Sequence, residues 1–152
     1  MVDKKAQIDN DCTEKVRDSK VKIHDRGTGK SAILLNLERT QIRRIRMDGC
    51  LSPAGAIAAD FLVSKPKAVD VIVELKGKNV EQIESTWMFW SKHAEHEEGQ
   101  LIGAWVICTE YPRASTKVAR YRESFRARGV ILLFSTRNGE ERAFSEFTHK
   151  RP

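Results

Sequence analysis

The segment between Asp60 and Lys76 constrains the fold more than any other part of the chain. Two apolar runs, residues 61–63 and 69–75, flank a short polar break that contains Pro66. The β-branched residues of these runs favour strands, whereas proline is confined to turns and sheet edges. The pattern therefore predicts an antiparallel hairpin whose turn lies at the polar break.

The second strand of this hairpin differs on its two faces, because side chains alternate along a strand. One face is apolar, and the other mixes apolar and charged side chains: Asp70, Ile72, Glu74 and Lys76. A Glu-x-Lys pair at the end of a strand is often only a solvated ion pair. The apolar residues around this one favour a chemical role, because charged side chains are seldom buried without a partner.

Glu74 and Lys76 are typical of a metal-dependent phosphodiesterase centre. Hydrolysis of a phosphodiester needs a hard cation held by oxygen atoms, an activated water and a positive group near the developing charge. Glu74 would bind the metal, and Lys76 would position or polarise the water. If paired residue numbers sum to about 134, Asp60 lies directly opposite Glu74 and supplies the second carboxylate. Asp70 lies about 13 Å from Glu74 along the same strand, too far to share one metal ion.

These residues resemble the PD-(D/E)xK nuclease superfamily, which has the restriction-endonuclease-like fold. In that superfamily an acidic residue on one core strand is followed by Glu-x-Lys on the next, as Asp60 is followed here by Glu74-Leu75-Lys76. The chain is similar to small stand-alone bacterial members over roughly residues 33–136. It departs from the motif at Ala59, which stands in place of the eponymous proline.

The resemblance implies Mg²⁺ or Mn²⁺ as the cofactor and Asp60 and Glu74 as its ligands. It also implies that Gln82, in the first turn of the following helix, assists catalysis, with simple surface duty as the alternative. Glu38 is a possible further ligand, because some members recruit an upstream acidic residue. Asp48 precedes Gly49 and is the weaker candidate, since Asp-Gly is a tight-turn signal.

Patterns downstream of the hairpin alternate between helix and strand. Residues 79–90 carry apolar side chains at helical spacing, and residues 101–109 form an apolar run typical of a buried central strand. A second helix up to Arg128 and a strand over 130–135 complete a βαβ unit with parallel strands. The predicted fold is α/β: a mixed sheet with a central antiparallel hairpin followed by a βαβ unit, a restriction-endonuclease-like core.

The first third of the chain is less regular. We expect residues 1–20 to form a loosely ordered N-terminal arm and residues 21–152 to form a single nuclease-like domain. Within that domain, we interpret residues 33–37 and 41–47 as two strands around a turn, with a partly helical segment as the alternative that periodicity leaves open. Residues 140–147 predict an edge strand. His93 and His96 share a helical face, but their charged neighbours indicate a solvated helix end rather than a zinc site.

The chain is basic, with a net charge of +6 and a pI near 9.4, which suits a polyanionic partner. Basic residues after the hairpin and around the second helix are the expected phosphate contacts: Lys78, Arg113, Lys117 and Arg120. A second basic set precedes the hairpin, where a phosphate-contacting ridge and a solvated strand face are equal alternatives: Arg39, Arg43, Arg44 and Arg46.

The three cysteines are odd in number and widely spaced, which argues for a reducing compartment and against a disulfide scaffold. No run reaches the ~20 apolar residues of a membrane span, and no signal peptide opens the chain, so we expect a cytoplasmic protein.

The expected function is hydrolysis of DNA or RNA phosphodiester bonds by a divalent-metal-dependent endonuclease with low or structure-based specificity. A homodimer is plausible if both strands of a duplex are cut. The alternative is a non-catalytic protein on the same fold, which would bind either a protein partner, as an immunity or regulatory protein does, or nucleic acid.

Overall fold

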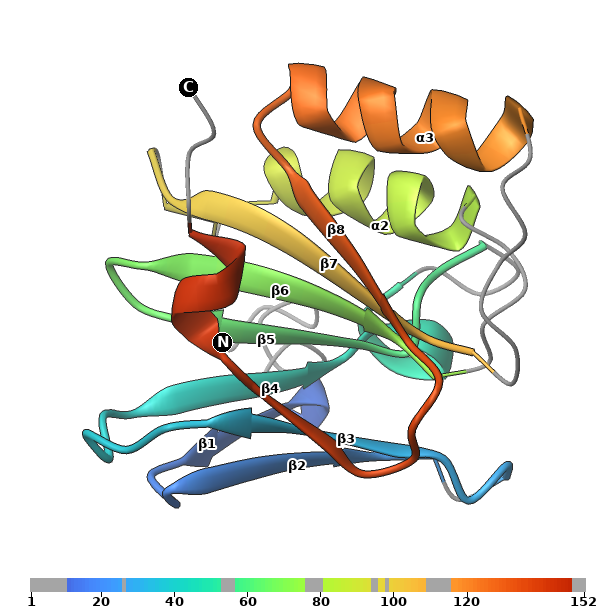
Figure 1. Ribbon diagram of the computed structural model, residues 1–152. Coiled ribbons are helices and arrows are strands. Elements are labelled where there is room, and N and C mark those ends of the chain that lie inside the picture. The colour runs from blue at the N-terminus through green and yellow to red at the C-terminus, as the bar shows by residue number, and fades with distance from the viewer. Residues whose placement is uncertain are drawn as a thin grey trace.

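The computed structural model of the protein describes residues 11–25, 27–52, 57–75, 81–93, 96–97, 99–108 and 116–148. Figure 1 shows three layers: two helices cover one face of a six-stranded sheet, and a three-stranded sheet lies against its other face. The described elements, in chain order, are β1 (Thr13–Val16), β2 (Lys20–His24), β3 (Ser31–Leu35), β4 (Ile42–Arg46), an irregular turn η1 (Met47–Leu51), β5 (Phe61–Lys65), β6 (Val69–Glu74), α2 (Glu81–Ser91), β7 (Leu101–Ile107), α3 (Thr116–Ala127), β8 (Ile131–Ser135), β9 (Glu140–Ala143) and a 3₁₀ turn η2 (Phe144–Phe147).

The architecture is α/β with mixed sheets. The larger sheet has the strand order β1-β4-β5-β6-β7-β8, and the smaller sheet has the order β2-β3-β9. In the larger sheet β6, β7 and β8 are parallel, whereas the pairs among β1, β4, β5 and β6 are antiparallel. The predicted βαβ unit is confirmed, because β7 and β8 are parallel and α3 connects them.

The predicted hairpin is also confirmed and consists of β5 and β6. Phe61 pairs with Val73 and Leu62 with Ile72, so the paired residue numbers add up to 134, as the sequence predicts. This register decides which side chains of the two strands share a face.

The two faces of β6 pack into separate apolar cores. Ile72 belongs to the helix-side core, between the larger sheet and the helices, together with Trp90 and Phe125. Val71 and Val73 belong to the sheet-side core, between the two sheets. Every residue of β6 is therefore buried, including its two acidic ones.

The close packing of η2 on β7 explains why a glycine stands at position 103. Gly103 lies in β7, and a Cβ atom there would lie 2.7 Å from the Cβ of Phe147 in η2. Only glycine allows η2 to pack this closely on the strand, although glycine otherwise weakens strands. Among the described residues, no helix combines the length and the apolar character needed to cross a membrane.

The smaller sheet was not predicted. Residues 31–35 and 42–46 form strands, but β3 and β4 lie in different sheets. Asn36 explains the change of sheet, because its buried side-chain amide donates hydrogen bonds to the carbonyl oxygens of Asp18 and Thr40. The expected edge strand over 140–147 is shorter: β9 pairs in parallel with β3, and η2 follows it.

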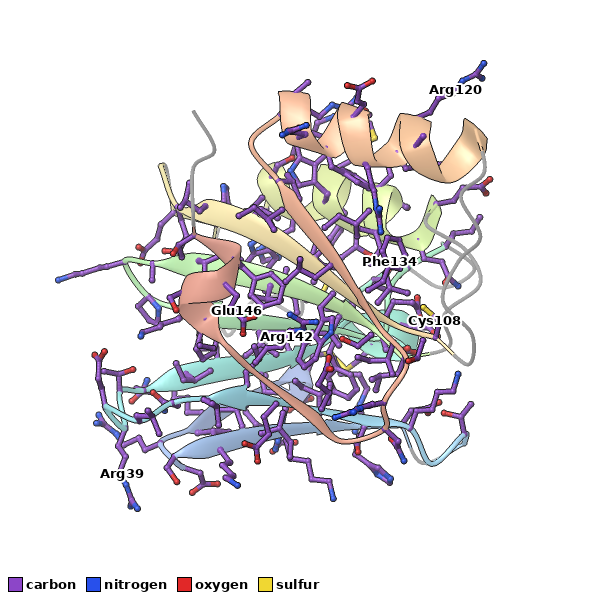
Figure 2. All side chains as sticks on the ribbon, in the orientation of Figure 1. Arg39, Cys108, Arg120, Phe134, Arg142 and Glu146 are labelled. Carbon is purple, nitrogen blue, oxygen red and sulfur yellow. A yellow bond between two sulfur atoms is a disulfide. The ribbon has the colours of Figure 1, made fainter. Side chains whose placement is uncertain are left out.

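A polar cluster attaches the C-terminal segment to the larger sheet. The hydroxyl of Ser135 accepts a hydrogen bond from Trp105 Nε1 at 2.8 Å and donates to the carboxylate of Glu140. Arg142 lies over the Trp105 ring and forms an ion pair with Glu146 at 3.0 Å, a pair visible in Figure 2. These contacts hold β9 across the sheet-side core.

The N-terminal arm differs from the expectation for residues 1–20 where the structure describes it. Residues 13–16 form β1, which pairs antiparallel with β4 from Thr13 opposite Ile45 to Val16 opposite Ile42. Backbone pairing with β4 orders this segment although its sequence lacks apolar periodicity, because a sheet edge offers hydrogen bonds to any extended chain.

The expectation that the cysteines form no disulfide is wrong. Cys12 and Cys50 are disulfide-bonded, with a Cα–Cα distance of 5.7 Å, and Cys108 is a buried free thiol. A separation of 38 residues carries no sequence signal, and only the pairing of β1 with β4 brings the two cysteines together. The cysteines therefore do not support a reducing compartment, and cytoplasmic localisation stays a prediction.

Candidate metal site

The hairpin brings Asp60 and Glu74 together at one end of the larger sheet. Glu74 is the last residue of β6, and Asp60 directly precedes β5. The ladder of the two strands ends at Phe61 opposite Val73, and continuing the same register by one residue sets Asp60 opposite Glu74. Directly opposite residues share a face, with Cα atoms about 4.5–5.5 Å apart. Both carboxylates therefore lie on the face that Ile72 presents to the helix-side core.

Hydrogen bonds from three neighbouring elements hold Asp60 and the residue before it. The backbone N–H of Leu75 donates to Asp60 Oδ2 at 2.8 Å, and that of Met47 donates to the carbonyl oxygen of Asp60 at 3.0 Å. The hydroxyl of Thr86 in α2 accepts a hydrogen bond from the N–H of Ala59 at 2.8 Å. Thr86 was not predicted, because one buried threonine in a helix gives no sequence signal of its own.

Both carboxylates are withdrawn from solvent. Asp60 is 8% exposed and Glu74 is 1% exposed. Two carboxylates that face each other across a strand pair repel, and a low-dielectric surround strengthens the repulsion. A divalent cation between them would turn this repulsion into attraction, and carboxylate oxygens are the ligands that Mg²⁺ prefers.

The pair fits magnesium or manganese chemistry better than a closed protein cage. The described residues contain no group of three or more His, Cys, Asp or Glu side chains suited to a metal ion. Magnesium commonly binds through one or two carboxylates and completes its octahedron with waters and substrate phosphates. Asp60 and Glu74 supply that number of carboxylates.

Asp70, the rival acidic residue on β6, is engaged at the other end of the strand. Its Oδ2 accepts a hydrogen bond from Trp90 Nε1 at 2.7 Å, and its Oδ1 accepts one from Gln100 Nε2 at 2.6 Å. His96 Nδ1 lies 3.3 Å from Oδ2. We call this group the Asp70 network. Its position agrees with the expectation that Asp70 cannot share a metal ion with Glu74.

The charged neighbours of His93 and His96 indicated a solvated helix end, but the structure shows both side chains withdrawn from solvent. His93 is buried, and its ring stacks on that of Trp90 with centroids 5.0 Å apart. His96 is half-buried against Asp70. The Asp70 carboxylate beside His96 lies 26 residues away in sequence, so local composition could not reveal this contact.

Two further predicted residues lie on the helices. Gln82 lies half-buried in the first turn of α2, four residues before Thr86 and thus on the same helix face. Arg120 is exposed on α3 and points away from the sheet in Figure 2. Lys117 belongs to α3, but its side chain lies outside the described part of the chain, as do the other three predicted residues, Lys76, Lys78 and Arg113.

The two additional acidic candidates do not join the buried pair. Glu38 forms an ion pair with Lys65 at 3.8 Å, and Lys65 ends β5 about 13 Å from the Asp60 end. Asp48 lies nearer, because its N–H bonds to the carbonyl oxygen of Ala59, but its side chain is exposed. The left-handed backbone of Gly49, φ 74°, confirms the turn predicted there.

Cys108 follows β7 at the same end of the sheet, where Val106 pairs with Glu74. Burial raises the pKa of its thiol above the ordinary value, and the charge of Lys30 offsets part of that rise. A raised pKa keeps this thiol in its protonated form near neutral pH.

Comparisons with protein-family models, curated proteins and solved structures found no match for this chain. Its function is therefore inferred from the residues and their arrangement.

Proposed function

We propose that this protein is a divalent-metal-dependent nuclease that hydrolyses phosphodiester bonds of DNA or RNA, built on a restriction-endonuclease-like core. One observation carries the proposal. Asp60 and Glu74 are both buried, and the β5–β6 register, continued one step past Phe61 opposite Val73, sets them opposite each other at the end of a hydrophobic hairpin. Like charges directly opposite each other destabilise a sheet, and a bound cation would offset that cost.

Each residue has a defined part in this mechanism. Asp60 and Glu74 would hold Mg²⁺ or Mn²⁺, and the ion would supply Lewis-acid chemistry that activates a water and polarises the phosphate. Lys76, two residues beyond Glu74 in the sequence, would position the attacking water or stabilise the charge that develops on the phosphate. Gln82 assists from the first turn of α2. The order of hairpin, helix, parallel strand, helix and strand supports the finer fold assignment.

The test is an assay of cleavage by the purified protein on labelled single-stranded DNA, duplex DNA and RNA. We expect cleavage in Mg²⁺ or Mn²⁺ and none in EDTA. Glu74→Gln keeps the size of the side chain but removes its charge, so we expect loss of cleavage. Lys76→Ala should also abolish it, because the attacking water loses its positive neighbour.

The outcomes separate the proposal from its alternative. Cleavage by Glu74→Gln at the wild-type rate would exclude the metal site, and metal-independent cleavage would exclude the mechanism. Salt-sensitive binding of nucleic acid without any cleavage would favour a non-catalytic binding module instead.

A further inference from the structure

A pocket of about 290 Å³ opens between the two sheets, outside the acidic pair. It lies where the edge strand β2 of the smaller sheet meets β1, β4 and β5 of the larger sheet. Its lining residues are Glu14, Lys22, His24, Arg44, Arg46 and Phe61. Four of these six side chains are basic and one is acidic.

The acidic lining residue is already paired. Glu14 Oε2 lies 2.6 Å from Arg44 Nη2, and the guanidinium of Arg44 also donates to the carbonyl oxygen of Lys22. Lys22, His24 and Arg46 are exposed and form no ion pair with a carboxylate among the described residues. The pocket thus holds an excess of positive charge that protein carboxylates of the described chain do not neutralise.

We infer that this pocket binds a backbone phosphate of a nucleic-acid strand, an inference that rests on the proposed nuclease function. The guanidinium of Arg46 matches the geometry of two phosphate oxygens, and Lys22 adds a compact charge. The half-buried ring of Phe61 supplies an apolar wall for a sugar or a base. The volume lies at the lower end for ligand pockets, which suits one nucleotide rather than a duplex groove.

The pocket lies close to the acidic pair in the sheet. Arg46 pairs with Phe61, and Phe61 pairs with Val73, so these residues and Glu74 lie at the same end of the larger sheet. Phe61 belongs to the sheet-side core, whereas Asp60, the residue before it, faces the helices. A strand held in the pocket therefore reaches the metal site around the end of the sheet.

The fold divides the four arginines that the sequence groups between positions 39 and 46. Arg44 and Arg46 line the pocket, whereas Arg43 lies on the other face of β4, with Nη2 3.4 Å from the hydroxyl of Ser64. Arg39 lies in the loop between β3 and β4. Figure 2 shows it at the opposite end of the sheets from Cys108, which marks the Glu74 end.

This division provides a matched pair of variants. The pocket variant is Lys22→Gln combined with Arg46→Gln, two exposed positions at which the change should leave the fold intact. The control is Arg39→Asn, because Arg39 has a positive φ of 51° and asparagine tolerates that backbone better than most residues. Circular dichroism and the thermal midpoint confirm that each variant is folded.

Binding is measured by fluorescence anisotropy with fluorescein-labelled single-stranded DNA and RNA, in EDTA so that no strand is cut, over a range of salt concentrations. We expect the pocket variant to bind roughly tenfold more weakly. The slope of log K against log salt should fall by about 0.7–0.9 for each phosphate that the variant no longer neutralises. Arg39→Asn should change neither value.

Equal affinity and equal slope for the pocket variant and the wild type would overturn the inference, and cleavage by the same wild-type preparation would leave the nuclease proposal standing. An equal loss in Arg39→Asn would also overturn it, because the effect would then come from net charge. A wild-type protein that binds neither nucleic acid would end both proposals together.

Discussion

The two ends of β6 each bury a carboxylate on the same face of the strand, but in opposite surroundings. At the start of the strand, Asp70 accepts hydrogen bonds from polar side chains of α2 and the loop that follows it. At the other end, the hairpin register continued by one residue sets a second carboxylate, Asp60, opposite Glu74. Burial is nearly equal, with Asp70 and Glu74 each 1% exposed.

The difference shows that burial alone does not identify a catalytic acid. The hydrogen-bond donors around Asp70 stabilise its negative charge without a bound ligand, so this carboxylate has a structural role. A second carboxylate opposite Glu74 raises the free energy of the charged pair, and a bound cation relieves it. The surroundings of a buried charge, more than its depth, indicate its role.

The largest expected effect is a difference in cleavage rate between variants at the two ends of the β5–β6 hairpin. Asp60→Asn should lower the rate of metal-dependent cleavage roughly a thousandfold, equivalent to about 4 kcal/mol of transition-state stabilisation. Asp70→Asn, a buried amide substitution on the same sheet face, should leave the rate of the folded enzyme within about threefold, a difference of under 1 kcal/mol. Single-turnover cleavage measures both, and a larger loss in Asp70→Asn would break the comparison.

The second effect concerns the disulfide near the acidic end. Cys12→Ser combined with Cys50→Ser opens a covalent loop spanning 38 residues, which should lower the free energy of unfolding by about 3–4 kcal/mol. Urea denaturation with and without reductant measures the change. When the wild-type protein is unfolded without reductant, thiol titration should find one reactive thiol, that of Cys108. Three reactive thiols would show that the disulfide does not form.

The third effect concerns the Asp70 network. Asp70→Ala removes the acceptor for Trp90 Nε1 and Gln100 Nε2, so the free energy of unfolding should fall by about 3 kcal/mol. Urea denaturation with an unchanged m-value measures it. Glu123→Ala, at an exposed acidic residue of α3, is the control and should stay within about 0.5 kcal/mol of the wild type. Equal stability of the two variants would refute a structural role for Asp70.

The smallest effect has the opposite sign. Without divalent metal, Glu74→Gln should raise the free energy of unfolding by about 0.2–1 kcal/mol, because one of two facing negative charges is gone. Mn²⁺ at a hundredfold excess over its Kd should stabilise the wild type by about 2.7 kcal/mol. The same addition should leave the thermal midpoint of Glu74→Gln unchanged. An equal metal-induced shift in both proteins would place the metal elsewhere.

Much of the local structure follows from residue patterns. The hairpin, its register, the two helices and the parallel strands could be predicted, because alternation and helical spacing are properties of neighbouring residues. The register that brings Asp60 and Glu74 to the same end of the hairpin follows from the same reasoning, since a hairpin turn fixes which residues pair. The roles of these two carboxylates remain a proposal, which the cleavage and metal-binding experiments test.

Other features escaped prediction because no short segment contains them. The partners of Asp70 lie 20 or more residues away, and the disulfide joins a residue before β1 to one in η1. The smaller sheet joins β2 and β3 to β9 from the far end of the chain. The basic pocket combines side chains from both sheets, so no single strand by itself indicates it.

The amino-acid sequence by itself determined the alternation of strands and helices, the hairpin turn and the register of the hairpin, because each depends on interactions between nearby residues. Only the tertiary structure decided which buried acid is hydrogen-bonded by the fold, which cysteines meet and which arginines gather around one cavity. These outcomes depend on the packing of sheets and helices whose contacts join residues far apart in the chain, and such contacts leave no periodic pattern in the sequence.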